Sequence, residues 1–190
     1  NKSIFKKEIN FIGMTEHLGK INNVKTTMIM VGDKFSIIPL TTHINLSKIN
    51  SFINKKVLVK TLKEILLQIK KDIYRLEINN IKFLCYNPHC GENSTLGVED
   101  NIISNSLSKF KKITGPYPAD SAFNKISPKT LYLSMYHDQA LIPFKILNKK
   151  ALNLTLGLNY RRISPAHGTA ADIKFKGTAN NSSYIECMQC

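Results

Sequence analysis

Three histidines each follow a short apolar run of the kind that forms a buried strand. They are His43, His89 and His137, and the runs before them end at Leu40, Tyr86 and Tyr136. In an open α/β sheet, ligands bind beyond the carboxyl ends of the strands, so these side chains could meet at one sheet edge. Three neutral imidazoles with an open fourth position make a catalytic site for Zn²⁺ or a related divalent ion. Their wide spacing matches no compact metal motif, so three unrelated loop histidines are an equally weighted alternative.

Such an ion would act as a Lewis acid on a substrate hydroxyl or ketone. Lys145 and Arg162 are the cationic side chains placed to bind a carboxylate or phosphate near it. For Lys145, a solvated surface charge is a strong alternative because lysine is abundant here. Arg162 is one of only three arginines and follows the strand-end glycine Gly157, which makes it the better candidate.

The elements that must position these residues alternate between strand and helix patterns, which predicts an α/β fold. Apolar residues at three- and four-residue steps predict amphipathic helices over 54–77 and 98–112. Thr15 is expected to cap a further short helix. The expected strands are 26–31 and 35–40, joined as a hairpin, then 81–86, 131–136 and 152–156. Residues 115–120, rich in glycine and proline, are expected to form a rigid loop.

The composition permits a sizeable core, since 43% of the 190 residues are hydrophobic, and it excludes global disorder. The net charge of +14 invites a nucleic-acid interpretation. We expect no nucleic-acid partner, because nearly all the cations are dispersed lysines and no nucleic-acid fold motif is present. A phosphorylated or carboxylated substrate would suit the same positive field. No apolar run approaches the roughly 18 residues of a membrane span, so no membrane partner is expected.

The four cysteines show no spacing typical of a secreted disulfide framework, which favours a reducing cytoplasm. Cys187 and Cys190 form a C-x-x-C at the chain's end, where a frayed tail is expected. The first residues carry no signal-peptide pattern. They also lack an initiator methionine, so the chain is expected to begin inside a longer protein.

Six motifs taken together resemble one enzyme family, the 4-hydroxythreonine-4-phosphate dehydrogenases. The resemblance runs in order from about Gly13 to Gly177. The motifs are Thr41-Thr42-His43, Asn87-Pro88-His89-Cys90-Gly91-Glu92, Gly115-Pro116-Tyr117-Pro118-Ala119-Asp120, Met135-Tyr136-His137-Asp138-Gln139, Asn153-Leu154-Thr155-Leu156-Gly157-Leu158 and His167-Gly168-Thr169-Ala170.

The resemblance implies an NAD- or NADP-dependent oxidation of 4-phosphooxy-L-threonine. Decarboxylation would then give 3-amino-2-oxopropyl phosphate, a step in pyridoxine 5'-phosphate biosynthesis. It also implies a divalent metal, Zn, Mg or Co, held by the three strand-end histidines, and a homodimer whose subunits share the active site. The implied substrate contacts are Thr15, Lys145, Asn153 and Arg162, and the implied proton-transfer or orienting groups are Asp120 and Asp138.

The loop that begins at His167 also resembles the adenosine-binding loop of isocitrate and isopropylmalate dehydrogenases. This implies their two-domain fold and a cofactor-binding role for His167, Gly168 and Thr169. On that fold, residues 1–128 would be mainly the second domain, with the substrate, metal and dimer-interface elements. Residues 129–190 would return to the NAD-binding first domain, whose N-terminal half is absent.

Three positions depart from the family pattern: Met14 replaces a usual histidine, Asn159 a proline and Ala166 an aspartate. A thioether cannot donate the hydrogen bond of an imidazole, so Met14 bears on substrate choice. Two alternatives therefore stand beside the main interpretation. One is a related metal-dependent decarboxylating hydroxy-acid dehydrogenase, and the other is an inactive metal-binding fragment.

Overall fold

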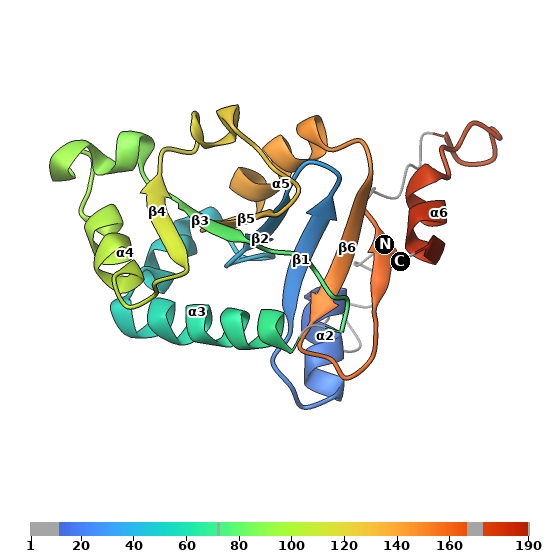
Figure 1. Ribbon diagram of the computed structural model, residues 1–190, viewed down its shortest axis with the longest axis horizontal. Coiled ribbons are helices and arrows are strands. Elements are labelled where there is room, and N and C mark those ends of the chain that lie inside the picture. The colour runs from blue at the N-terminus through green and yellow to red at the C-terminus, as the bar shows by residue number, and fades with distance from the viewer. Residues whose placement is uncertain (1–11, 72, 167–172, 190) are drawn as a thin grey trace.

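A computed structural model describes residues 12–71, 73–166 and 173–189. These residues form one mixed seven-stranded sheet in the order β4-β3-β5-β2-β1-β6-β7, flanked by helices (Figure 1). The α/β class predicted from the sequence is confirmed. The strands are β1 Thr27–Gly32, β2 Ser36–Pro39, β3 Asn80–Leu84, β4 Ile113–Tyr117, β5 Thr130–Ser134, β6 Ala151–Leu156 and β7 Ile163–Pro165.

The sheet has a parallel half and an antiparallel half that meet at β2. Strands β4, β3, β5 and β2 run parallel to one another, whereas antiparallel pairs join β2 to β1, β1 to β6 and β6 to β7. The predicted hairpin is β1–β2, with Met30 opposite Ile37. Parallel strands place their carboxyl ends at one sheet edge, so the parallel half is the part that gathers the loops after β2, β3 and β5.

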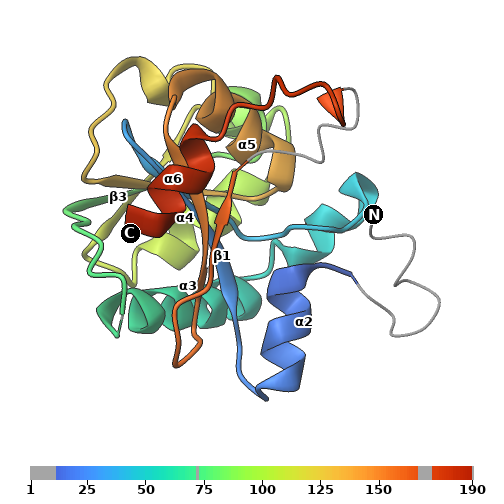
Figure 2. The same ribbon diagram turned by 90° about the vertical axis from the view of Figure 1, so that its right-hand side faces the viewer.

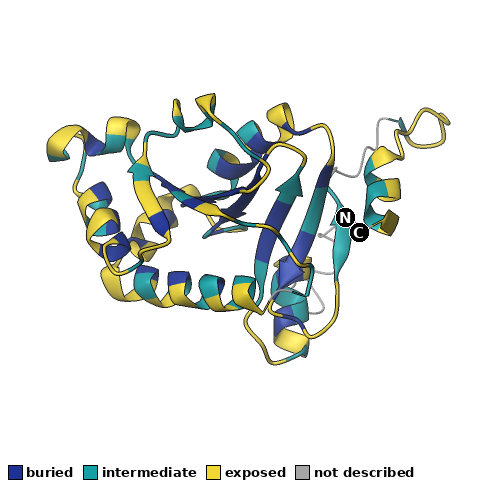
Figure 3. Ribbon diagram, in the orientation of Figure 1, coloured by how far each residue is buried: buried dark blue, intermediate teal, exposed yellow. Residues whose placement is uncertain are grey.

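Successive strand residues point to opposite faces of the sheet, and each face carries its own apolar cluster. Ile29 and Ile38 pack on one face, under α3 (Lys55–Lys70) and α4 (Glu99–Leu107). Met30 and Ile37 pack on the other, under α5 (His137–Leu147). The result is three layers, helices on both faces of a buried sheet, and Figure 3 shows the burial concentrated in the central strands. No helix among the described residues is long and apolar enough to cross a bilayer.

Two helix boundaries in the first half of the chain differ from the sequence prediction. The helix α2 spans Met14–Ile21, and its N-cap is Gly13, so Thr15 lies inside the helix instead of capping it. The helix α3 begins where predicted, with the Asn54 side chain accepting from the Lys56 amide, but ends at Lys70 and not near residue 77.

The early end of α3 has a tertiary cause. The Tyr74 hydroxyl accepts a hydrogen bond from the Arg162 amide at 2.7 Å, and the Arg161 guanidinium donates to the Ile73 carbonyl. These contacts tie the segment to the β6–β7 region, and Arg75 adopts a left-handed φ of 58°. Contacts with residues distant in sequence therefore end the helix, although the apolar spacing predicted that it would continue.

Three further elements were not predicted. The expected rigid loop at 115–120 begins inside β4, an edge strand, which is where a strand can accommodate Pro116. The predicted helix 98–112 is shorter, because α4 ends at Leu107 and buried Ile113 starts β4. The helix α5 begins at His137 and the strand β7 directly follows Arg162, and neither had a separate signal in the sequence.

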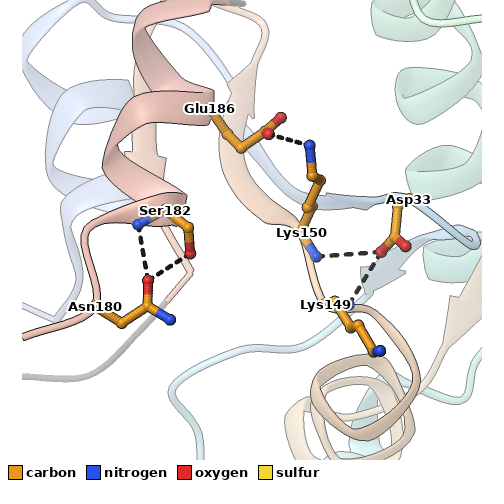
Figure 4. A network of polar contacts seen from close by, with 6 residues as sticks. All are labelled: Asp33, Lys149, Lys150, Asn180, Ser182 and Glu186. Carbon is orange, nitrogen blue, oxygen red and sulfur yellow. Dashed lines mark hydrogen bonds and ion pairs between the residues drawn. The ribbon is translucent and has the colours of Figure 1, made fainter.

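The C-terminal segment was expected to fray, but Ser182–Gln189 is a helix, α6, that packs beside β6 and β7 (Figure 2). Just before its first turn, the Asn180 side chain accepts from the Ser182 amide and hydroxyl. Glu186 then forms a 2.6 Å ion pair with Lys150, the residue before β6 (Figure 4). On the same connection, Asp33 accepts from the amides of Lys149 and Lys150. Packing against the sheet thus orders a segment that is only weakly helical by itself.

Candidate metal and substrate site

The three strand-end histidines follow three adjacent parallel strands. His43 lies beyond β2, His137 beyond β5 and His89 beyond β3, and β5 pairs with both of the others. The histidines therefore lie beyond the same edge of the sheet, with His137 following the middle strand. This is the arrangement that the sequence predicted for side chains placed after parallel strands.

Hydrogen bonds fasten the three strand-end segments to one another. The Thr41 hydroxyl donates to the Met135 carbonyl at 2.5 Å, which joins the segments after β2 and β5. Gln139, in the first turn of α5, accepts from the Met135 amide at 3.0 Å and donates to the Cys85 carbonyl at 2.7 Å. One amide side chain thus bridges the segments that carry His137 and His89.

His43 and His137 are brought together, with their ring centroids 6.0 Å apart. Each ring has a carboxylate at its Nδ1 atom. Glu16 Oε1 lies 3.4 Å from His43 Nδ1, and Asp138 Oδ1 lies 2.6 Å from His137 Nδ1. A carboxylate on Nδ1 selects the tautomer in which Nε2 is the coordinating nitrogen, as it does for metal-bound histidines.

Glu16 is held in its ionised form. The hydrogen bond with His43 is the main cause that lowers the pKa of this carboxyl from 4.5 to about 2, and a second bond from Thr42 adds to it. Half-burial opposes the shift but does not cancel it. The site therefore contains a fixed negative charge beside one imidazole.

His89 lies in an unusual left-handed turn. His89, Cys90, Glu92 and Asn93 all have φ between 41° and 57°, and Gly91 lies among them at 78°. Left-handed backbone is unfavourable for residues with a Cβ, so the surrounding contacts must hold the turn.

Buried Asp100 supplies those contacts. Its two carboxylate oxygens accept from the amides of Tyr86, at 2.7 Å, and Asn87, at 2.9 Å, at the entry to the turn. Inside the turn, burial is the main cause that raises the pKa of the Cys90 thiol to about 12, with neighbouring Cys85 contributing. Cys90 is therefore a protonated, weakly reactive thiol.

Two hollows lie among the strand-end residues. One, of about 720 Å³, is lined by His89 and Asp120, and the other, of about 190 Å³, is lined by His43 and His137. Tyr136 and Asp138 line both hollows and so stand between them. Among the described residues, no group of three or more His, Cys, Asp and Glu side chains could hold a metal ion within this one chain.

The donor set fits a divalent cation in two respects. Each metal–nitrogen bond is about 2 Å long, so rings separated by 6.0 Å are near enough to share an ion. Both rings also have an orienting carboxylate at Nδ1. His43 and His137 are therefore the pair that would hold the metal within one chain, and His89 lies in the neighbouring hollow.

The four implied substrate contacts fall in three places. Thr15 is buried next to Glu16 in α2, and Lys145 is exposed in the last turn of α5. Asn153 lies on β6, and Arg162 immediately precedes β7, with its carbonyl accepting from the Thr155 amide. Strand alternation places Asn153 and Arg162 on the same face of this strand pair.

Asn153 and Arg162 each have one buried side-chain atom that could bond to a ligand. Asn153 Oδ1 and Arg162 Nη1 are buried without a hydrogen-bond partner in the described part of the chain. Burial also lowers the pKa of the Arg162 guanidinium. Unpartnered buried donors and acceptors are costly, so Arg162 Nη1 is suited to an anionic ligand group and Asn153 Oδ1 to a ligand group that donates a hydrogen bond.

Two predictions about site residues remain: the proton-transfer or orienting role of Asp120 and the cofactor-binding loop. Asp120 is exposed at the wall of the larger hollow. His167, Gly168 and Thr169, predicted to bind the cofactor, lie outside the described residues.

Sequence reasoning missed Glu16, Gln139 and Asp100, the side chains that position the histidines. Gln139 stands inside a recognised motif and Glu16 is next to the predicted substrate contact Thr15, but the partners of both are far away in sequence. Asp100 had a local signal: it is a carboxylate on the buried face of an amphipathic helix.

The whole chain, residues 1–190, matches the family model described as "Pyridoxal phosphate biosynthetic protein PdxA". A protein from Hydrogenobaculum sp. (strain Y04AAS1) named 4-hydroxythreonine-4-phosphate dehydrogenase is 40% identical over 92% of this chain and 56% of its own length. One of the same name from Aquifex aeolicus (strain VF5) is 36% identical over 97% of this chain and 59% of its own length. The chain thus spans a little over half the length of these curated relatives.

Solved structures that carry the same enzyme name have a similar fold. The crystal structure of 4-hydroxythreonine-4-phosphate dehydrogenase from Klebsiella pneumoniae superimposes with a TM-score of 0.73 at 28% identity, covering 94% of this chain and 56% of that one. A structure of the enzyme from Burkholderia phymatum gives 0.71 at 29% identity, covering 99% and 59%. A terephthalate 1,2-cis-dihydrodiol dehydrogenase from Burkholderia xenovorans LB400 shares the fold, with a TM-score of 0.62 at 19% identity over 93% of this chain and 59% of that one. With a family model matched along its full length, this chain belongs to the PdxA family of pyridoxal phosphate biosynthetic proteins.

Proposed function

We propose that this protein acts as an NAD-dependent, divalent-metal-dependent 4-hydroxythreonine-4-phosphate dehydrogenase. It would oxidise 4-phosphooxy-L-threonine, and loss of CO₂ would give 3-amino-2-oxopropyl phosphate for pyridoxine 5'-phosphate biosynthesis. The observation that carries the proposal is the strand-end arrangement of His43, His89 and His137, with a carboxylate at Nδ1 of two of the rings. The names of the curated relatives and of the structural neighbours support it.

A divalent ion bound here would supply Lewis-acid chemistry, polarising a substrate oxygen. Glu16 and Asp138 would keep His43 and His137 in the tautomer needed to hold that ion. The unpartnered atoms of Asn153 and Arg162 would bind polar substrate groups, with Thr15 and Lys145 contributing from α2 and α5. Asp120, exposed at the wall of the larger hollow, is placed to accept a proton.

The active site would be completed by a second copy of the chain. His89 is exposed, and the hollow that it lines continues over the apolar outer face of α5, where Ile146 is 75% exposed. Exposed apolar surface beside a functional cavity is typical of an interface. A homodimer that brings His89 of one copy toward the His43–His137 pair of the other would complete the three-histidine set.

The wider organisation is part of the same proposal. The protein would have the two-domain fold of isocitrate and isopropylmalate dehydrogenases, with residues 1–128 mainly in the second domain. Residues 129–190 would return to the first domain, where the 167–169 loop would bind NAD or NADP. The working location would be the cytoplasm, with Zn, Mg or Co as the metal.

The experiment is an NADH-formation assay of the purified protein with 4-phosphooxy-L-threonine and each of the three metals. We expect activity that chelation abolishes and metal restores, and a loss of at least about 10²-fold in His137→Ala, since metal-held charge stabilisation contributes several kcal/mol. Lys129→Ala, which removes an exposed ion pair with Glu77, is the matched control and should keep full activity. Metal-loaded protein that turns over no substrate would refute the proposal.

Met14 favours one competing function, a related dehydrogenase that decarboxylates another phosphorylated hydroxy acid. Its side chain is exposed at the start of α2, next to Thr15, and offers no hydrogen-bond donor. The same assay with other 3-hydroxy acids decides between the two. Met14→His should then shift the preference toward 4-phosphooxy-L-threonine if this position reads the substrate.

A further inference from the structure

Glu16 makes a set of contacts that centres on His43. Its Oε1 atom lies 3.4 Å from His43 Nδ1 and accepts a 2.5 Å hydrogen bond from the Thr42 hydroxyl. The second contact matters because it comes from the residue next to His43 and fixes the same oxygen. The carboxylate is therefore oriented by one neighbour and directed at the other.

The backbone beside Glu16 leaves room for this arrangement only because residue 13 is glycine. A Cβ on Gly13 would lie 2.3 Å from Glu16 Oε2 and 2.7 Å from His43 Nδ1. Both distances are far below van der Waals contact, and the obstructed atoms belong to the two side chains that face each other. Gly13 is the N-cap of α2 and Glu16 is the third residue of that helix, so the helix start sets the reach of the carboxylate.

We propose that Glu16 is a positioning residue that fixes the tautomer and ring orientation of His43 for a divalent cation. The proposal rests on the proposed function only in taking His43 as a metal ligand. An ionised carboxylate only accepts hydrogen bonds, so the proton it receives lies on His43 Nδ1, and Nε2 is the nitrogen that coordinates. Glu16 does for His43 what Asp138, at 2.6 Å, does for His137.

The length of the Glu16–His43 contact determines how much Glu16 should contribute to metal affinity. Outer partners of metal-bound histidines typically contribute 10–100-fold to metal affinity. At 3.4 Å the Glu16 contact is longer than the Asp138 contact, so the Glu16 contribution belongs at the lower end of that range. The two carboxylates make the two imidazoles a preorganised pair.

Two measurements on the purified protein test this role. The first is the His43 tautomer in the metal-free protein, read from long-range ¹H–¹⁵N NMR correlations. The second is Zn²⁺ affinity by calorimetry. In Glu16→Ala we expect His43 to lose the fixed Nδ1–H tautomer and Zn²⁺ to bind about 10-fold more weakly.

Glu16→Gln is the rescue variant, since it keeps an oxygen acceptor of the same size. It should retain the tautomer and most of the affinity. Gly13→Ala should reproduce the alanine phenotype by displacing the carboxylate. Glu77→Ala, which loses only an exposed pair with Lys129, should match the wild type, and thermal unfolding confirms that each variant folds.

The outcomes separate the two proposals. Wild-type protein that binds no Zn²⁺ counts against the proposed metal-dependent function, while the NMR measurement still judges Glu16. A His43 tautomer and Zn²⁺ affinity unchanged in Glu16→Ala would overturn the positioning role and leave the dehydrogenase proposal standing.

Discussion

A single carboxylate, Glu16, shows how a residue in the site ties function to stability. Its pKa of about 2 lies below the usual value of 4.5, chiefly because it bonds with His43. A carboxyl whose folded pKa is depressed stabilises the fold above its unfolded pKa. That stabilisation is lost as the pH falls from about 4.5 through about 2.

We therefore predict that Glu16→Gln lowers the free energy of unfolding at neutral pH and makes it depend less on pH in the acid range. The wild type should exceed the variant in free energy of unfolding at pH 6, and the difference should shrink as the pH falls from about 4.5 to 2. Urea unfolding at a series of pH values measures this. Glu77→Gln, whose ion pair is exposed, should show little change, because solvent screens such pairs. A Glu16 difference that is constant with pH would contradict the cited pKa shift.

The left-handed turn around His89 is the element on which the site depends most. Left-handed backbone costs roughly 1–2 kcal/mol per residue with a Cβ. Asp100 offsets part of that cost through its two backbone hydrogen bonds at the entry to the turn. The helix α4, which follows the turn along the chain, thereby fixes the loop beyond β3.

Asp100→Ala should lower the free energy of unfolding by about 2 kcal/mol, because it leaves the partly buried amides of Tyr86 and Asn87 unsatisfied. Those two amides should also exchange with solvent faster. The matched control is Asp33→Ala. Asp33 likewise accepts from two backbone amides, but on the exposed connection before β6, so its loss should cost less. Equal effects in the two variants would mean that burial of Asp100 is not the cause.

Over the whole molecule, stability is concentrated in the parallel half of the sheet. Every residue of β5 is buried, and both neighbours of β5 are hydrogen-bonded to it. At the far side, α6 has no buried residue, and its ion pair with Lys150 is exposed on the lysine side. Segments with few buried apolar contacts open locally at low free-energy cost.

Native-state hydrogen exchange should therefore rank the elements. Amides of β5 and β3 should be the slowest to exchange, and those of α6 the fastest among the helices. Glu186→Gln, which breaks the pair with Lys150, should speed exchange in α6 and leave β5 unchanged. Exchange in α6 as slow as in β5 would show a docking stronger than the contacts described.

The sequence by itself determined the features that repeat over short distances. Short apolar runs predicted β1, β2, β3, β5 and β6, and helical spacing predicted the start of α3 next to its N-cap, Asn54. Motifs of four to six residues identified the family. The placement of three histidines at one end of the sheet could also be predicted, because the carboxyl ends of parallel strands lie at the same edge.

Only the tertiary structure decided the boundaries and partners that depend on distant residues. Tyr74 ends α3 early through contacts with residues more than eighty positions away. The edge strand β4 exists because β3 offers it a partner, and Glu16 meets His43 across 27 positions. Local patterns record which face of an element is apolar. They do not record which polar group stands opposite, because that contact forms only when separate elements pack.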